Sequence, residues 1–452
     1  MSKQDQSKFL PPEIEKQFFY IIDELCHRLI YPKQLKSIVD QPGNHEPLFD
    51  TSVWAPCTIS HVLCGTSIFY SILANKYESF RAVAHNHLLL ATSTINWCIN
   101  GGVMGGPSGL LAAAQIASRS PMDYSKLREQ LTAWICRCQL YLINRYRSSL
   151  GNGVPWLAYD IMNGICGNLR ILLDENSTNA RETINLSVKY LCDLVLTSNS
   201  QGMPGWWVPG NLQPTKQDEN EYPDGDLNVG VAHGAAGILG TLVSVFNYGY
   251  TDTRVMDSIK RIMEWTFHWT QHADDFDYWP ARIPTNCQIQ DDVLSPLPTR
   301  AGWCYGTPGI AVEMLRASTL LDDVDTTGHI IDILSSHLSS PTNQWHIAGP
   351  TFCHGYAGVL YSVFKAWTLC GSEVLRNIGS NMANNLLAMA DECSPFVYQH
   401  WMYSNTPSHK INLKKLDNVG LLEGSSGIGL VLYSICNQGD SSANWDRVFA
   451  LS

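Results

Sequence analysis

Long apolar segments recur along the chain, and most of them follow a pair of glycines. A Gly-x-x-Gly pair leads into such a segment six times, beginning at Gly106, Gly164, Gly234, Gly306, Gly355 and Gly424. A weaker seventh copy, GTSIFYSIL, begins at Gly65 and has Ile68 in place of the second glycine. Six pairs with the same apolar continuation are more than 34 glycines in 452 residues give by chance. The pattern therefore indicates an internal repeat.

The intervals between the copies leave room for a second helix in each repeat. Apolar residues at helical spacing mark amphipathic helices within residues 127–142, 184–195 and 374–386. Two helices per repeat predict an all-α fold, a double α-ring or α,α-toroid of about seven helix pairs. The apolar helices after the glycines should form the inner ring and the amphipathic helices the outer ring. The residues just before the glycines should then gather at one mouth of the ring.

Two stretches interrupt this pattern. Residues 197–230 and 267–302 are rich in Pro, Trp, Asn and Asp and show little helical period. We expect them to be insertions near the mouth, with short strands, that together form a small irregular or α/β subdomain. We expect residues 1–452 to form a single toroid domain around them.

Composition narrows the class of protein. Apolar residues make up 45% of the chain and charged residues 16%, which is typical of a folded protein with much buried surface. The net charge of −11 argues against a nucleic-acid partner. It would favour a basic peptide, although an acidic balance is commonly only a solubility feature. No apolar run approaches the roughly 18 residues of a membrane span, and the N-terminus carries no secretory pattern, so we expect a cytoplasmic protein.

The residues just before the glycine pairs are chemically unusual. Cys304 stands two positions before Gly306, within Trp303-Cys304-Tyr305, and Cys353-His354 directly precedes Gly355. His233 precedes Gly234, and Asp160 lies four residues before Gly164. Taken alone, the two cysteines would be read as buried core residues, like most of the 14 in the chain. Their shared position in the repeat favours a common site at the mouth instead.

Two thiolates and one imidazole form a suitable zinc set. Cys304, Cys353 and His354 would leave the fourth position of one zinc ion open, as in catalytic rather than structural sites. A zinc ion with two thiolate ligands suits a thiol substrate, which points to sulfur alkylation rather than peptide hydrolysis. The chain has no HExxH helix of the metalloprotease kind.

Three motifs together carry a family resemblance. WCYGTPG, CHGYAG and AHGAAG, with the lead-in YPDGDLNVGVAHG from Tyr222 to Gly234, resemble the lanthionine synthetase C-like family and in particular the stand-alone cyclases of class I lantibiotics. The resemblance covers roughly residues 60–430 and keeps the family's motif order. The family's fold is a double α-ring, which agrees with the repeat pattern.

The resemblance implies roles for individual residues. Cys304, Cys353 and His354 match the family's zinc ligands, and His233 matches its proton donor or base. The other residues that match the active site are Asp160, Arg300, Trp303 and Tyr305. Non-catalytic roles stay open for four of these residues. His233 could be a hydrogen-bonded core histidine, Asp160 a turn residue, Arg300 a surface or leader-binding residue, and Trp303 a packing residue.

The resemblance also implies an activity. The protein would be a zinc-dependent cyclase that adds cysteine thiols to dehydroalanine and dehydrobutyrine, forming lanthionine and methyllanthionine rings in a lantibiotic precursor. Its partners would be the dehydrated precursor peptide with its leader, a lantibiotic dehydratase and an export transporter, through which it would lie peripherally at the membrane.

Three alternatives remain at this point. A protein of the same family could act on glutathione or on dehydrated proteins, or the ring could serve as a peptide-binding scaffold in a biosynthetic complex. Protein prenyltransferase β-subunits are also double α-rings with thiol-activating zinc, but their ligand set includes an Asp, and the WCYG and CHG motifs argue against them.

Overall fold

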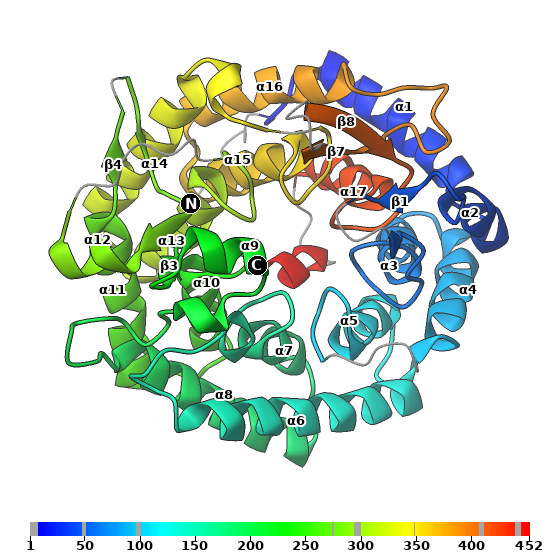
Figure 1. Cartoon of the computed structure of the whole chain (residues 1–452). Coiled ribbons are helices and arrows are strands. Elements are labelled where there is room, and N and C mark those ends of the chain that lie inside the picture. The colour runs from blue at the N-terminus through cyan, green and yellow to red at the C-terminus, as the bar shows by residue number, and fades with distance from the viewer. Residues whose placement is uncertain are drawn as a thin grey trace, which may run out of the picture.

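The helices are arranged as two concentric rings. A computed structural model describes residues 8–47, 51–95, 101–273, 275–292, 300–347, 349–405, 411–438 and 444–452, and Figure 1 views it along the ring axis. The inner helices of this described part are α3 (Leu63–Leu73), α5 (Pro107–Ala117), α7 (Ile165–Leu172), α10 (Ala235–Asn247), α13 (Thr307–Leu320), α15 (Tyr356–Cys370) and α17 (Ser425–Cys436). Each contacts the next, and α17 contacts α3, so the inner ring is closed.

An outer helix packs against each inner one. The outer helices that follow their inner partners are α4 (Phe80–Thr92), α6 (Ser125–Arg147), α8 (Thr178–Leu196), α11 (Thr253–His268), α14 (Val324–Ser339) and α16 (Glu373–Leu387). The seventh outer position is taken by α1 (Pro12–Arg28), which packs on α17 from the other end of the sequence. The double α-ring expected from the repeat is thus confirmed, and the N-terminal helix completes it.

Burial explains why the two sets occupy different rings. Residues 235–245 of α10 are buried on every side, which suits a helix with neighbours all around it. In α11 only one face is buried, with Val255, Ile259 and Ile262 pointing to the inner ring. The inner helices are therefore the uniformly apolar segments, and the outer helices are the amphipathic ones.

The second glycine of each pair lies against the backbone of the loop before it. A Cβ on Gly237 would lie 2.2 Å from the Val231 carbonyl oxygen, and one on Gly109 would lie 2.2 Å from that of Val103. Gly65 has the same relation to Ile59, at 2.9 Å. Gly65 therefore corresponds to the second glycine of the other copies, and the expectation that it is the first glycine, with Ile68 in place of the second, is wrong.

The first glycine of that copy is replaced by Val62, which is the N-cap of α3 as Gly234 is of α10. The copy was misaligned because the sequence offers one glycine and no second glycine three residues away in either direction. The correction brings His61 to the position just before the first glycine, where His233 and His354 stand in their own repeats.

A short helix from the end of the chain fills the centre of the ring. The 3-10 helix η6 (Trp445–Phe449) lies inside the inner ring in Figure 1. Phe449 is fully buried, and its ring stacks on Phe352 with 4.1 Å between centroids. Arg316, from α13, donates both to Glu313 and to the Ala450 carbonyl oxygen. The central space of this ring is therefore packed rather than open.

The two interrupting stretches meet in space. Strand β3 (Asp226–Asn228) pairs antiparallel with β6 (Arg282–Pro284), and the other elements of these stretches are η3 (Gly210–Leu212), α9 (Lys216–Glu221), β4 (Gln271–His272), β5 (Asp277–Tyr278) and α12 (Thr285–Gln290). Arg282 joins them further, with hydrogen bonds to Asp226 at 2.6 Å and Asp218 at 2.5 Å. Part of the second stretch, residues 293–299, lies outside the described residues.

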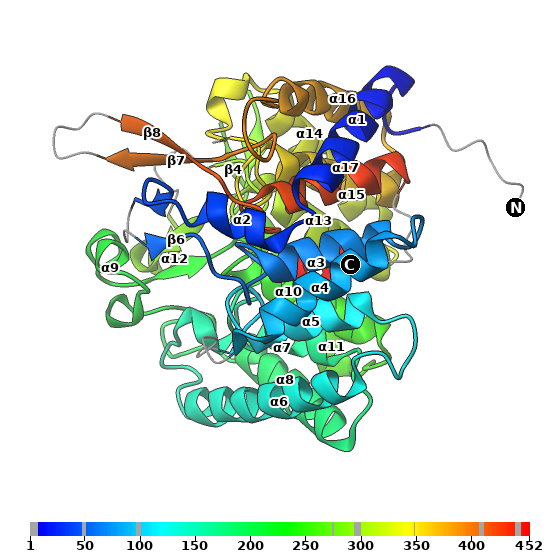
Figure 2. The same ribbon diagram turned by 90° about the vertical axis from the view of Figure 1, so that its right-hand side faces the viewer.

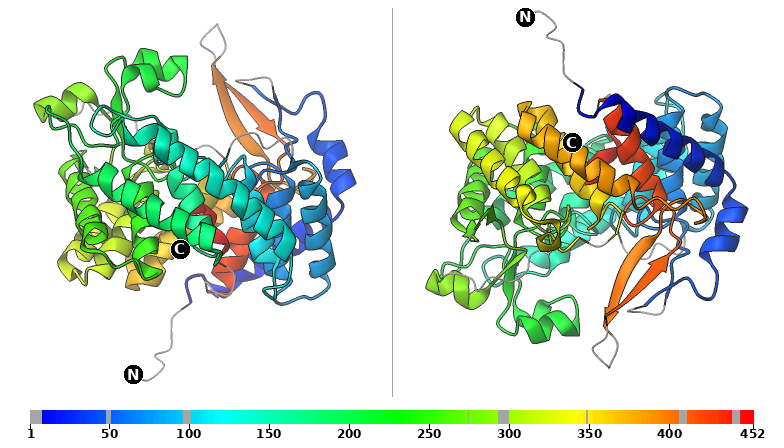
Figure 3. Two further views of the ribbon diagram at one scale, coloured as in Figure 1. Left: turned by 90° about the horizontal axis from the view of Figure 1, so that it is seen from below. Right: turned by 90° about the horizontal axis from the view of Figure 1, so that it is seen from above.

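The longest strands lie where the sequence reading did not expect them. Strands β7 (His400–Asn405) and β8 (Ile411–Leu416) form a hairpin outside both interrupting stretches. Figures 2 and 3 show this hairpin and α9 projecting from the same face of the ring. The remaining elements are α2 (Pro32–Val39), η2 (Trp156–Ala158), η4 (Thr342–Gln344) and the short pair β1 (His45–Glu46) and β2 (Thr51–Ser52). Within the described residues, every helix is too short or too polar to cross a membrane.

Candidate metal and proton-transfer site

The seven loops that precede the inner helices are joined edge to edge. Each donates a hydrogen bond to the loop of the next repeat, for example from Cys304 N to Cys353 O at 3.2 Å and from Cys353 N to Leu422 O at 3.0 Å. The remaining links are Met104 N to Met162 O, Ile161 N to Ala232 O, Ala232 N to Cys304 O, Leu421 N to Ile59 O and Ser60 Oγ to Met104 O. This closed circle of hydrogen bonds is what brings residues distant in sequence to one mouth.

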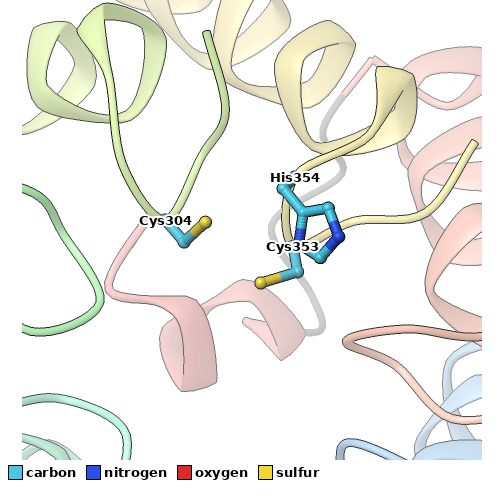
Figure 4. A group of neighbouring side chains, drawn as sticks. All are labelled: Cys304, Cys353 and His354. Atoms are coloured by element: carbon cyan, nitrogen blue, oxygen red, sulfur yellow. The ribbon is translucent and has the colours of Figure 1, made fainter. Parts of the chain in front are cut away.

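The structure brings the three expected metal-binding side chains together. The ligand atoms of Cys304, Cys353 and His354 all lie within 4.8 Å of one another. Figure 4 shows that Cys304 comes from the loop before α13 and the other two from the loop before α15, with the two sulfurs facing each other. Among the described residues, these three form the one group of His, Cys, Asp or Glu side chains close enough together to hold a metal ion.

The pKa values of the two cysteine thiols are shifted in opposite directions. A hydrogen bond from Cys353 keeps the pKa of the Cys304 thiol well below its usual range, aided by His354 and by the charge of Arg300. The same hydrogen bond raises the pKa of the Cys353 thiol well above its usual range. A thiolate is therefore already favoured at Cys304, and metal binding would have to release the proton of Cys353.

His233 is held by a buried carboxylate. Its Nδ1 lies 2.6 Å from Asp160 Oδ2, and the Asp160 side chain is 3% exposed while that of His233 is 20% exposed. Asp160 Oδ1 also accepts from the backbone N–H of Asn163 at 2.9 Å. The indole of Trp156 stacks on the imidazole at 4.2 Å between centroids. The imidazole is therefore fixed through Nδ1, which leaves Nε2 for chemistry.

The other residues expected at the site differ in exposure. Arg300 is exposed and near enough to the cysteines to act on their pKa values. Tyr305 is half-buried. Burial of its hydroxyl, and to a lesser extent the negative charge of the nearby Cys304, raises the pKa of that hydroxyl above its usual range, so the side chain stays a neutral phenol. Trp303 is fully buried, and its indole N–H donates to the Phe449 carbonyl oxygen at 3.1 Å, on the side of the central helix η6.

Three side chains at the same mouth were missed by sequence reasoning. His61 and Glu423 stand just before the first glycine position of the first and seventh copies, with His61 Nε2 3.6 Å from Glu423 Oε2. His400, the first residue of β7, lies with its ring 5.5 Å from that of His354. The repeat position could have identified Glu423, whereas His61 was hidden by the misaligned first copy and His400 lies outside the repeat.

Fold and site together define an α,α-toroid with a Cys-Cys-His group at its mouth. The chain belongs to the lanthionine synthetase C-like family, whose sequence model matches residues 53–450. It is similar to the nisin biosynthesis protein NisC of Lactococcus lactis subsp. lactis, with 23% identity over 318 residues that cover 68% of this chain and 73% of NisC. It also resembles the solved structure of nisin cyclase, with a TM-score of 0.74 and 20% identity over 98% of both chains.

Proposed function

We propose that this protein is a zinc-dependent peptide cyclase that adds cysteine thiols to dehydroalanine and dehydrobutyrine, forming lanthionine and methyllanthionine rings in a lantibiotic precursor. The observation that carries the proposal is the convergence of Cys304, Cys353 and His354 at the mouth of a ring in a member of this family. It is further supported by the similarity of the chain to a nisin biosynthesis protein and to the structure of nisin cyclase.

The three side chains fit one zinc ion. Zinc–sulfur bonds of about 2.3 Å and zinc–nitrogen bonds of about 2.0 Å place two sulfurs and one nitrogen at tetrahedral positions roughly 3.5–3.8 Å apart. The observed spread of up to 4.8 Å needs only small side-chain movements to reach that arrangement. Zinc, when bound, would lower the pKa of a substrate thiol that reaches its open position, and so favour the nucleophilic thiolate.

The chain's own residues would handle the protons. Asp160 holds His233 at Nδ1, so Nε2 is free to accept the thiol proton or to return a proton to the α-carbon. One carbon–sulfur bond and one carbon–hydrogen bond form as the carbon–carbon double bond is lost, and no oxidant is needed. Trp156 excludes water from one face of the imidazole and limits its rotation.

We propose supporting roles for the remaining residues. Tyr305, kept neutral by burial, can donate a hydrogen bond to the developing enolate oxygen. Arg300 sits at the exposed edge, where its charge favours thiolates and can also attract a carboxylate of the peptide. Trp303 acts by packing, since its indole lies against Phe449 behind the cysteine loop.

The substrate would be a precursor peptide already dehydrated at Ser and Thr, with its leader. A dehydratase would supply this peptide, and an export transporter would receive the product. We therefore propose that the protein works in a complex with them, peripherally at the cytoplasmic side of the membrane. We also propose that the strands and helices joined by Arg282 act as one small insertion within a single domain. Arg282 lies over the ring of Trp156, which stacks on His233, so the insertion borders the proton-transfer pair.

The test is to incubate the purified, zinc-loaded protein with a dehydrated precursor peptide and to count free thiols over time. Ring closure consumes one thiol per ring without changing the peptide's mass. A parallel reaction contains glutathione and a dehydrated peptide without cysteines. A glutathione adduct there, without ring closure in the first reaction, would support the glutathione-acting alternative. Binding without either reaction would favour a scaffold.

A further inference from the structure

The mouth of the ring contains a second imidazole–carboxylate pair. Around the ring, Asp160 and His233 belong to the third and fourth repeats, and the metal-binding group follows in the fifth and sixth. Glu423 and His61 come next, from the seventh and first repeats. The candidate zinc site is therefore flanked on both sides by a histidine that faces a carboxylate of the preceding repeat.

The His61–Glu423 pair is more exposed than the Asp160–His233 pair, whose side chains are 3% and 20% exposed. The side chains of His61 and Glu423 are 31% and 26% exposed, so both can be reached from the mouth. His61 stands in the same position of its repeat as His233 does, directly before the N-cap of an inner helix. A substrate held at the three metal-binding residues would therefore have an imidazole on either side.

The partners of His61 place an acceptor atom near each ring nitrogen. Its Nδ1 lies 2.9 Å from Ser60 Oγ, and that hydroxyl is 3.1 Å from the Met104 carbonyl oxygen, which can only accept. With the hydroxyl proton directed to Met104, Ser60 Oγ offers a lone pair to an N–H at Nδ1. The other nitrogen, Nε2, faces the Glu423 carboxylate. Both ring nitrogens thus face acceptors, so the geometry accommodates an N–H at Nε2 that points towards the mouth of the ring.

His61 also has a proton to give. The 3.6 Å between Nε2 and Glu423 Oε2 exceeds the range of a hydrogen bond, so this N–H is attracted by the carboxylate but not bound to it. Of the other imidazoles around Glu423, His354 is assigned to the metal, and burial lowers the pKa of His400 to about 4, which keeps it neutral. The charged or titratable groups on the surrounding loops of the described chain are Glu423, His400, His354, Cys353 and the more distant Arg300.

We propose that His61, positioned by Glu423, is a second catalytic residue that delivers the proton to the α-carbon while the thiol proton leaves on the His233 side. In this step the sulfur forms a bond to the β-carbon, the electrons of the double bond move to the α-carbon, and the Nε2 proton of His61 forms the new carbon–hydrogen bond. His61 then regains its proton from solvent. The inference rests on the proposed cyclase function.

The decisive variant is His61→Gln, measured for the kcat and KM of ring closure, zinc content and thermal midpoint. We expect full zinc content, an unchanged midpoint, an unchanged KM for the peptide and a kcat lowered about 10²-fold, the lower end of the range for general acid catalysis. The matched control is His272→Gln, which removes a histidine paired with Asp277 at 2.6 Å on β4 and β5.

Glu423→Gln adds a readout that a structural role would not give. Loss of the carboxylate should lower kcat while the KM for the peptide and the zinc content stay unchanged, because the uncharged amide no longer positions the Nε2–H of His61. Glu423→Asp, which keeps the charge, should recover part of the lost rate. If wild-type protein closes rings while His61→Gln does so with an unchanged kcat, or with only a raised KM for the peptide, the second-acid role is wrong. If wild-type protein closes no rings, the proposed function itself fails.

Discussion

Single side chains at the mouth divide into those that would bind metal and those that would move protons. Cys304, Cys353 and His354 converge within 4.8 Å, whereas His233 is tied to Asp160 rather than to the cysteines. The two groups can therefore be separated by substitution.

Cys304→Ala should abolish zinc binding and ring closure while leaving the helical content unchanged. It removes the sulfur whose thiolate form is favoured, and a large ring of packed helices does not depend on one ion. Metal analysis and far-ultraviolet circular dichroism measure the two effects. The control is Cys393→Ala, which replaces an exposed cysteine away from the group. Full zinc content in Cys304→Ala would show the ligand assignment to be wrong.

His233→Ala should retain zinc but close rings about 10²–10⁴ times more slowly, the usual contribution of a general acid or base. Asp160→Asn should act in the same direction and more mildly, because the amide can still orient Nδ1 although it does not stabilise the charged imidazole. Cyclisation rate and zinc content are measured on both. Zinc loss in His233→Ala would instead make His233 a ligand, and an unchanged rate would assign the proton to another group.

At the scale of elements, the turn before each inner helix is fixed by the second glycine. Gly237 lies so close to the Val231 carbonyl oxygen that any side chain must displace the loop leading to His233. The glycine is therefore needed for close backbone approach and not for flexibility.

Gly237→Ala should lower the stability by about 1–3 kcal/mol, the usual cost of overpacking, and reduce the rate by shifting His233. The matched control is Gly328→Ala in α14, where an added Cβ meets nothing within 4 Å. That substitution should stabilise the protein by roughly 0.5–1 kcal/mol through helix propensity. Urea unfolding of both variants tests the difference, and equal effects would contradict the close-approach argument.

At the scale of the whole molecule, the two ends of the chain complete the ring, one on the outside and one at the centre. Helix α1 packs on α17, and the central helix η6 fills the space inside the inner helices. Phe449 of η6 contacts Trp303 and Phe352, the neighbours of the two metal-binding cysteines. The central packing therefore supports the loops that carry the site.

Phe449→Ala should destabilise the protein by about 3–5 kcal/mol, as expected for loss of a fully buried aromatic side chain. It should also weaken zinc retention, because the Trp303 and Phe352 rings lose their support. Phe19→Ala is the control, since Phe19 is 41% exposed, and its effect should stay near 0.5 kcal/mol. Thermal unfolding with and without a zinc chelator measures both quantities. A midpoint for Phe449→Ala close to that of Phe19→Ala would contradict a supporting role for η6.

The sequence by itself determined the repeat and most of the ring. Gly-x-x-Gly followed by an apolar run is a local requirement of a tight turn and a fully buried helix, so it is visible without a structure. The same pattern singled out the cysteines and histidines before the glycines, because equivalent positions of a closed ring must meet at one end. The longest hairpin, β7–β8, was not expected, because short strands outside the repeat give a weak local signal.

Only the tertiary structure decided which residues meet across the ring closure. The register of the first copy depends on the contact between Gly65 and the backbone at Ile59, and the hydrogen bond from Leu421 N to Ile59 O joins the last loop to the first. The contacts with Leu421 join opposite ends of the chain, and a Cβ on Gly65 would also lie 2.8 Å from Leu421 N, so no local pattern encodes them. They are the reason that His61 and Glu423 lie 3.6 Å apart beside the metal-binding group.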